Sequence, residues 1–357
     1  MVVNEFRQMR RDHRALAMMI VLPLLMLVVF GYAASFDVSD VPVRVVGPQA
    51  EQVASELPDT LAVEEVVPAD GEEEGRDALV DGAVVAVVVT SKTGEGRVLV
   101  DGSQLFSARA VANGIAAEAP ALQVEILFNP DLDTSAVMVP AIAGMILVFI
   151  GTVITSLGMV RERTAGTLEQ LSVMPFRPRD VLVGKIAPYF AIAALDLLVV
   201  IGVGVLLFDV PFNGSPWLLA LGSALFLLVT LGIGLLVSSV SENSGQAIQL
   251  ALMTLLPQVL LSGMIFPLEA MAAGIRWLAY ILPLTYFVDI SRAVMLRGAS
   301  IEAVAQPLAL LAVLGTVVFG LALLRTRRDL VPVRRRTRSK DPGPDPGPER
   351  EPHAVAP

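Results

Sequence analysis

The stretch that decides the fold consists of three consecutive segments: MVPAIAGMILVFIGTVITSLGMV (138–160), RERTAGTLEQLSVMPFRPRDVLVGK (161–185) and IAPYFAIAALDLLVVIGVGVLLF (186–208). The first and third segments are almost purely apolar, whereas the middle strip is strongly charged and contains helix-breaking residues. An α-helix needs about 20 predominantly apolar residues to cross the hydrocarbon core of a bilayer. We therefore expect two membrane-spanning helices that are separated by a polar loop.

Apolar blocks of similar length recur along the chain, of which 54% is hydrophobic. Glycine and proline within a block do not exclude a span, because transmembrane helices tolerate both. The sequence therefore predicts a membrane α-helical protein with six transmembrane helices. The predicted spans are 15–34, 138–160, 186–208, 217–239, 247–266 and 307–324, so that spans three to five occupy 186–266.

Residues 35–137, between spans one and two, have a different composition. They hold five basic and nineteen acidic residues. Strand-like runs alternate with helix-like runs, which indicates a small α/β layer, and about 100 residues suffice for one small core. We therefore predict an acidic α/β domain inserted between the first two spans. The strand-like runs are 41–46, 61–66, 83–90, 97–102 and 123–128, and the helix-like runs are 50–57, 72–80 and 107–119.

The basic residues lie outside this acidic domain. Arginines precede span one, fill the strip 161–185 and follow span six in RTRRDLVPVRRRTRSK (325–340). Lysine and arginine accumulate in short cytoplasmic loops. The chain is therefore expected to be multi-pass, with the strip and both termini in the cytoplasm and residues 35–137 outside.

Both ends of the chain carry further predictions. In residues 1–14, apolar residues recur at helical spacing among arginines. This pattern is typical of an amphipathic helix at the membrane interface, although a basic flank that only fixes topology explains it equally well. The tail 325–357 is basic at first and then rich in proline and glycine, so we expect its final part to be disordered.

Residues that carry chemistry are scarce in this sequence. It has no cysteine, and its two histidines are His13 and His353, so thiolate and histidine metal sites are not expected. The phosphate-cradling pattern G-x-x-x-x-G-K-[ST] is absent, as are G-x-S-x-G and H-E-x-x-H. We predict no catalytic residue, no metal, no cofactor bound by this chain and no nucleic-acid partner. Any work that the chain performs must draw its energy from a partner.

The strip itself contains the pattern of a short helix. Thr167 and Gln170 fit a capping box, in which each side chain satisfies a backbone amide of the other residue. The helix would follow Gly166, which loosens the end of span two, and would stop before Pro175. A loop that only sets topology is the alternative, but it needs neither a cap nor an apolar face. The apolar face of the predicted helix consists of Leu168, Leu171 and Met174.

The segment RERTAGTLEQLSVMPFRPRDVLVGKIAPY (161–189) resembles the E-R-E-x-G-T-x-E-x-L…P…E-L-L-x-G-K stretch of the type-2 ABC transporter permeases. These are membrane subunits of bacterial exporters of the kind implicated in multidrug and antibiotic efflux. The resemblance extends over residues 4–330 and includes LSGMIFPLEAM and LAYILPLTYFVDISRAVMLRG in the C-terminal half. Ala272 departs from it, because the family often has proline there, and this difference concerns only the local turn.

The resemblance implies a permease subunit that moves a hydrophobic or amphipathic, drug-like small molecule outward across the bacterial cytoplasmic (inner) membrane. It implies pairing with a second permease subunit, identical or different, and docking on a separate cytoplasmic ABC ATPase that binds ATP-Mg. Residues 267–306 would form re-entrant helices on the outer side, and the loop 161–185 would transmit the ATPase movement. The docking residues would be Arg161, Glu162, Arg163, Gly166, Thr167, Leu168, Glu169, Gln170, Leu171, Met174, Pro175 and Arg179.

Polar residues within the spans are candidates for a translocation path. Asp196 lies near the middle of span three, where intramembrane carboxylates usually face a bundle interior or water. It is either a contact for a cation or proton, or a packing residue that is protonated or linked to water. In span five, Pro257 frees the carbonyl of Met253 next to Thr254 and Gln258, which suits a path and helix packing about equally.

A second class of function stays open at this point. A membrane-anchored receptor or tether could use the acidic outer domain to bind a ligand without transport. The capped helix in the strip favours the permease, since a receptor needs no ATPase-docking element. An exporter of polysaccharide or lipid-linked glycan is a lesser option, because such members of the family tend to lack a large domain between spans one and two.

Overall fold

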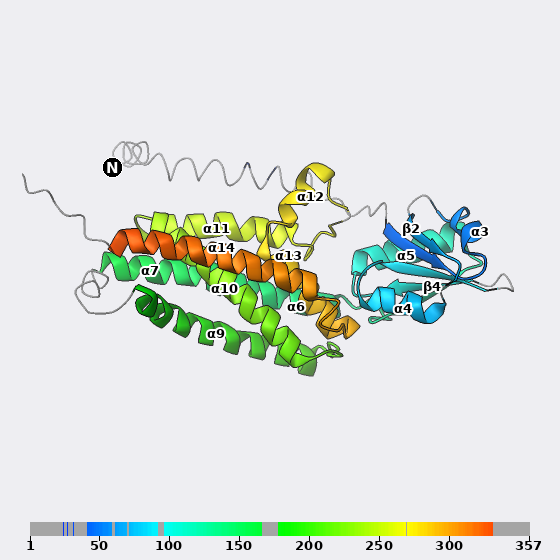
Figure 1. The fold of residues 1–357 in the computed structure, drawn as a ribbon, viewed down its shortest axis with the longest axis horizontal. Helices are drawn as coiled ribbons and strands as arrows, with labels where there is room; N and C mark the ends of the chain where they lie inside the picture. The colour runs from blue at the N-terminus through cyan, green and yellow to red at the C-terminus, as the bar shows by residue number, and fades with distance from the viewer. Residues whose placement is uncertain are drawn as a thin grey trace, which may run out of the picture.

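The computed structural model describes residues 24, 27, 31, 41–58, 61–69, 71–91, 96–165, 178–268 and 270–330. The described chain forms an elongated helical bundle and a smaller unit that contains a β-sheet, which lies beyond one end of the bundle (Figure 1). We call residues 41–127 the sheet unit and the adjoining end of the bundle the sheet end. The predictions for the N-terminal helix, for most of span one, for the centre of the strip and for the tail beyond residue 330 concern residues outside these ranges.

Five helices among the described residues are long and apolar enough to cross a membrane. The first is continuous from Thr134 to Thr164 and consists of α6 (Thr134–Val148), a π-helical segment η1 (Phe149–Ile154) and α7 (Thr155–Thr164). The other four are α9 (Pro178–Leu207), α10 (Pro216–Val240), α11 (Ser244–Leu261) and α14 (Ala305–Leu330). The apolar parts of α9 and α14 are Ile186–Leu207 and Ala305–Arg325. The prediction of a membrane α-helical protein is confirmed.

Local capping explains where several of these helices begin and end. Asp133 caps α6 by accepting a hydrogen bond from the Ser135 backbone amide at 3.1 Å, and Asn243 caps α11 in the same way from Gln246. α11 ends at Leu261, earlier than the predicted boundary of 266, because the chain turns at Gly263 with a φ of +77°. A left-handed residue of this kind stops an α-helix.

The sheet unit has five strands in the order β2-β1-β3-β4-β5, and all pairs are parallel except β3 with β4. The helices α3 and α5 pack on one face, and α4 packs on the other. Valines that alternate along the strands fill both layers, as expected for an α/β arrangement. The elements are β1 (Val41–Val46), α3 (Ala50–Ala54), β2 (Leu61–Val67), α4 (Glu72–Val80), β3 (Ala86–Thr90), β4 (Gly96–Asp101), α5 (Leu105–Glu118) and β5 (Gln123–Leu127).

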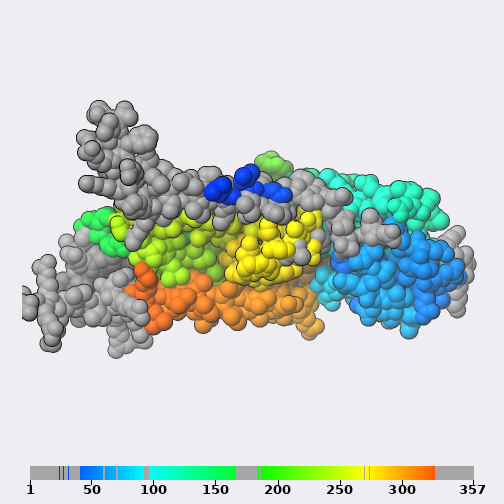
Figure 2. All heavy atoms as spheres, turned by 90° about the horizontal axis from the view of Figure 1, so that it is seen from above, coloured from blue at the N-terminus to red at the C-terminus, as the bar shows by residue number. Residues whose placement is uncertain are grey.

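The segment between α11 and α14 is helical but broken. It contains α12 (Ala273–Ala279), α13 (Pro283–Arg292) and a π-helical turn η2 (Ala293–Arg297), none of which is long enough to span a bilayer. α13 packs against α6 and α10, where Phe287 stacks on Phe226 with ring centroids 4.6 Å apart. Seen from above, α12 (yellow) lies near the sheet unit (blue to cyan), whereas the orange-red part of α14 lies at the far end (Figure 2).

Candidate functional site

The two ends of the strip lie at one end of the bundle (Figure 1). We call this the loop end, where α7 ends at Thr164 and α9 begins at Pro178, opposite the sheet end (Figure 1). Arg163 donates a hydrogen bond from Nη2 to the backbone carbonyl of Ser241, which directly follows α10. The first residues of the strip are therefore tied to the end of a neighbouring helix.

The structure describes only part of the predicted docking residues. Arg161, Glu162 and Arg163 lie in the last turn of α7, and Arg179 lies in the first turn of α9. The rest of the predicted docking surface lies outside the described residues: Gly166, Thr167, Leu168, Glu169, Gln170, Leu171, Met174 and Pro175.

In the middle of the helix that leads to the loop end, η1 approaches α10 closely. A Cβ on Gly151 would overlap the side chain of Thr230, and a Cβ on Gly234 would overlap the carbonyl oxygen of Gly151. Small residues permit such close crossings of helices in membranes. The π-helical geometry is visible in the hydroxyl of Thr155, which donates to the carbonyl of Ile150, five residues back. The sequence analysis did not predict this crossing, although one glycine in span two, Gly151, and one in span four, Gly234, are the residues that permit it.

The α11 candidates form a hydrogen-bonded group. Thr254 Oγ1 donates to the carbonyl of Ala251 at 2.8 Å, and Gln258 Nε2 donates to the carbonyl of Thr254 at 3.1 Å. The helix continues past Pro257 to Leu261. Gln258 is 2% exposed, and its Oε1 has no hydrogen-bond partner among the described residues. Both side chains thus bond carbonyls of their own helix, although not the Met253 carbonyl that Pro257 frees, and Gln258 keeps one buried acceptor without a partner among the described residues.

Asp196 lies on a different helix from this group. It is half-buried in α9, and no hydrogen bond or ion pair joins it to another described residue. α9 packs mainly against α6, whereas α11 packs against α7, η1 and α13. The two helices lie on opposite sides of the bundle (Figure 1). A single chain therefore does not bring Asp196 together with Met253, Thr254, Pro257 and Gln258.

A further polar cluster joins the bundle to the sheet unit, and the sequence analysis did not find it. Arg297, in η2, donates from Nη1 to Oδ2 of Asp101 at 3.3 Å and from Nη2 to Oδ1 of Asp289 at 3.5 Å. The side chains of Arg297 and Asp101 are 6% and 0% exposed. Because 196 positions separate these two residues, no local pattern could predict their contact.

These features define a multi-pass membrane protein, and comparison with known sequences gives its class. The model of the family described as "ABC-2 family transporter protein" matches residues 13–324, so the chain belongs to this family. It is the transmembrane permease subunit of an ABC exporter, a non-enzymatic component whose family implies an ATPase partner. The prediction of a permease is thereby confirmed.

Three relatives illustrate the similarity. The chain is 32% identical to the probable multidrug ABC transporter permease YbhS of Escherichia coli K12, over 92% of this chain and 96% of the relative. It is 25% identical to the probable multidrug ABC transporter permease YbhR of the same strain, over 93% and 98%. The inner membrane transport permease YhhJ of that strain is 33% identical over 58% of this chain and 56% of the relative. None of these similarities favours the receptor or tether.

Proposed function

We propose that this chain exports a hydrophobic or amphipathic, drug-like compound outward across the bacterial inner membrane, powered by a separate cytoplasmic ATPase. The names of two relatives, which describe probable multidrug permeases, support the substrate class. In this proposal the partner binds ATP-Mg and this chain binds no cofactor. Transport would require a second permease subunit, which is the usual way to enclose a path between helical bundles.

The proposed topology has six spans, with span one at 15–34 before the sheet unit and with both termini in the cytoplasm. One observation carries it: the sheet unit lies at one end of the bundle, and the two ends of the strip emerge at the other (Figure 1). The sheet unit is acidic and the strip is basic, so the positive-inside rule assigns the loop end to the cytoplasm. The sheet unit would then be the extracytoplasmic domain, with α12 and α13 beside it on the outer side.

The proposed coupling runs from the ATPase through the strip into the bundle. Arg163 ties the end of α7 to Ser241, and the Gly151–Gly234 crossing holds η1 against α10. Because closely packed helices move together rather than deform, a push on the strip would be carried into α10. The path itself would be lined by Asp196 and by the half-buried Met253, Thr254 and Pro257 of α11, which could face Asp196 only across two paired subunits, whereas Gln258 is buried within its own chain.

Docking is tested by charging the predicted apolar face of the strip. Leu171→Asp should leave membrane insertion intact and abolish co-purification with the ATPase. Ala116→Asp, at an exposed position of α5 in the sheet unit, is the matched control and should co-purify normally. Unchanged co-purification of the Leu171→Asp variant would remove the docking role.

Topology is tested by single cysteines, which can be introduced cleanly because the chain has none. A membrane-impermeant thiol reagent applied to whole cells should label Ser91→Cys but neither Ser172→Cys nor Ser339→Cys. Labelling at position 339 would contradict the six-span topology, and labelling at position 172 would contradict a cytoplasmic strip.

A further inference from the structure

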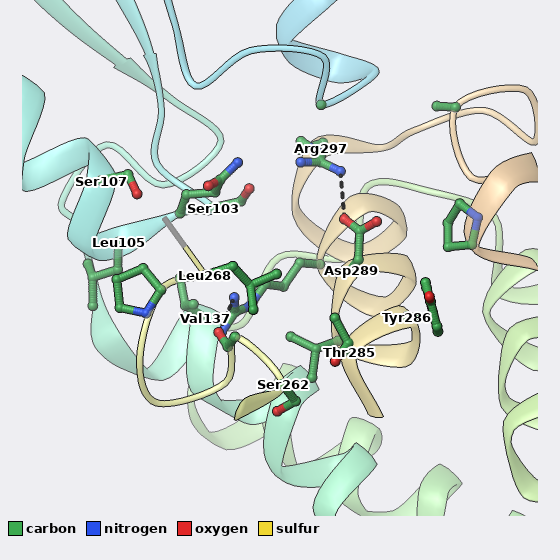
Figure 3. Close-up of a pocket in the computed structure, with 18 of the residues that line it drawn as sticks. Ser103, Leu105, Ser107, Val137, Ser262, Leu268, Thr285, Tyr286, Asp289 and Arg297 are labelled. Atoms are coloured by element: carbon green, nitrogen blue, oxygen red, sulfur yellow. Dashed lines mark hydrogen bonds and ion pairs between the residues drawn. The ribbon is translucent and has the colours of Figure 1, made fainter. Parts of the chain in front are cut away.

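A cavity of about 390 Å³ lies where the sheet unit meets the bundle. The start of α5 forms one wall, and α13 with η2 forms the opposite wall (Figure 3). Its apolar surface includes Leu105, Val137 and Leu268. Sites for small molecules typically have volumes of roughly 300–1,000 Å³ and combine an apolar lining with a few converging polar groups. The volume of this cavity is therefore within the range of ligand sites, and its lining is more polar than that of most of them.

Three serines that line this cavity have buried hydroxyls without a hydrogen-bond partner in the part of the chain that the structure describes. Ser103 and Ser107 belong to the sheet unit and Ser262 follows α11, and the exposed fraction of each is 1% or less. Each Oγ is buried without a partner among the described residues. A buried hydroxyl without a partner costs free energy, and native proteins leave few of them.

Buried hydroxyls elsewhere in the described bundle do not share this property. Thr152, Ser223 and Ser238 each donate to a backbone carbonyl three or four residues back in their own helix. All the buried hydroxyls that lack a partner among the described residues line the one cavity. This concentration indicates groups that are kept available for a ligand rather than chance defects of packing.

The charges around the cavity balance. Asp81 and Asp289 are opposed by Arg292 and Arg297, and the guanidinium of Arg297 is already paired with Asp101 and Asp289. A ligand of either charge would meet a like charge nearby. By contrast, serine hydroxyls both donate and accept, the buried Nε of Arg297 can donate, and the carboxylate of Asp289 can accept. A ligand that offers several donors and acceptors without a net charge satisfies all of these groups.

We propose that this junction cavity binds an uncharged amphipathic compound with a hydroxyl-rich head, such as a sugar, attached to an apolar body. The hydroxyls of the head would bond Ser103, Ser107 and Ser262, and the body would contact Leu105, Val137 and Leu268. This proposal rests on the proposed export function only in that the ligand would be the transported compound. Binding to the cavity itself requires neither the ATPase nor transport.

The test uses the purified full-length chain in lipid nanodiscs. Methylumbelliferyl glucoside, galactoside and mannoside are titrated by equilibrium dialysis, with methoxymethylcoumarin as the counterpart that has the same ring but no sugar. At least one glycoside should bind more tightly than the counterpart. Ser103→Ala/Ser107→Ala should weaken binding of that glycoside at least about fivefold, since two hydrogen bonds to the ligand are lost. Ser262→Ala, which changes the residue that follows α11, should weaken it by a smaller factor because only one hydrogen bond is lost.

Thermal unfolding without ligand separates a binding role from a structural one. Removing hydroxyls that have no partner should leave the unfolding midpoint of Ser103→Ala/Ser107→Ala unchanged or raise it. Ser223→Ala is the control, because it removes a satisfied buried hydroxyl away from the cavity and should lower the midpoint while leaving glycoside binding intact. A double variant that loses stability but retains glycoside binding would overturn the proposal, as would equal binding of the glycosides and methoxymethylcoumarin.

Two sources of such a head are distinguished by the lipid. Nanodiscs that contain monoglucosyl diacylglycerol should compete with the soluble glycoside if the ligand is an outer-leaflet glycolipid, and should not compete if it is a soluble compound. Export assays with the ATPase present remain independent. Export without glycoside binding would contradict the cavity site and leave the proposed export function intact. Glycoside binding without export would support the cavity site and contradict the proposed export function.

Discussion

The helices α9 and α10 have almost the same mean hydropathy and very different packing. Their most apolar windows score 2.7 and 2.4, yet 17% of the α9 window and 61% of the α10 window is buried. α10 packs against η1, α7, α13 and α14, whereas α9 packs mainly against α6. Side chains such as Leu195, Leu198 and Leu206 stay exposed along α9. Hydropathy therefore reports where a helix resides and not how tightly it is packed.

The physical reason is that lipid tails are as apolar as leucine, so an exposed leucine on a transmembrane helix carries no hydrophobic cost. Packing in the bilayer depends on shape, and α10 owes its packing to glycines such as Gly222, Gly232 and Gly234, which admit neighbouring side chains or backbone. The exposed side of α9 is left for lipid or for a second subunit. The following variants test this difference between a tightly packed side of the bundle, formed by α10 with α13 and η2, and the loosely packed α9.

The largest effect is expected at the buried ion pair on the packed side. Arg297→Ala leaves the fully buried carboxylate of Asp101 without its guanidinium partner, which should destabilise the protein by about 3–5 kcal/mol. Arg97→Ala is the control, because the ion pairs of Arg97 are largely exposed and should contribute about 0–1 kcal/mol. Denaturant unfolding of the purified chain measures both, and equal losses would show that the Arg297–Asp101 contact is not buried.

The next effect is expected at the helix crossing. Gly234→Ala places a methyl group against the carbonyl oxygen of Gly151 and should cost about 1–3 kcal/mol of stability through overpacking. Gly202→Ala in α9 is the matched control, because nothing lies within 4 Å of its added Cβ. It should be neutral or slightly stabilising, since alanine favours a helix more than glycine does. Similar thermal unfolding of the two variants would abolish the contrast between α10 and α9.

A smaller, pH-dependent effect is expected at the start of α6, the helix that contacts both α13 and α9. Hydrogen bonds from the Ser135 hydroxyl and amide lower the pKa of Asp133, the N-cap of α6, below its usual value of about 3.9. The carboxylate form therefore stabilises the fold above that value, and this contribution is lost as pH falls through the lowered pKa. Asp133→Ala should lower the unfolding midpoint slightly at neutral pH and match the wild type in strong acid. A difference between them that persists in acid would contradict this origin.

The smallest effect on stability is expected in α9. Asp196→Asn should change the free energy of unfolding by less than about 0.5 kcal/mol, because no described residue pairs with Asp196. If Asp196 contacts a cation, export of cationic compounds by Asp196→Asn should fall while export of neutral compounds is retained. Equal export by the variant and the wild type, across compounds of different charge, would identify Asp196 as a packing residue.

The candidate site was predictable only where it is local in the sequence. The helices around the strip and the position of Asp196 within one of them follow from hydropathy and charge, which each segment carries by itself. The tight crossing of Gly151 with Gly234 and the junction cavity depend on residues from distant segments. Nothing in the sequence distinguishes Ser103 and Ser262 from other serines, and only their burial around one cavity shows them to be polar groups without partners among the described residues.

The sequence by itself determined that this is a membrane α-helical protein with acidic and basic segments in separate stretches, because hydropathy and charge are summed over short stretches of chain. The permease class came from the resemblance of its motifs to a known family and from the family comparison. Only the tertiary structure decided that α10 is packed and α9 exposed, that α11 and Asp196 lie on opposite sides, and that Arg297 reaches Asp101 across 196 positions. Those outcomes depend on how surfaces fit in three dimensions, and neither composition nor periodicity along the chain records that fit.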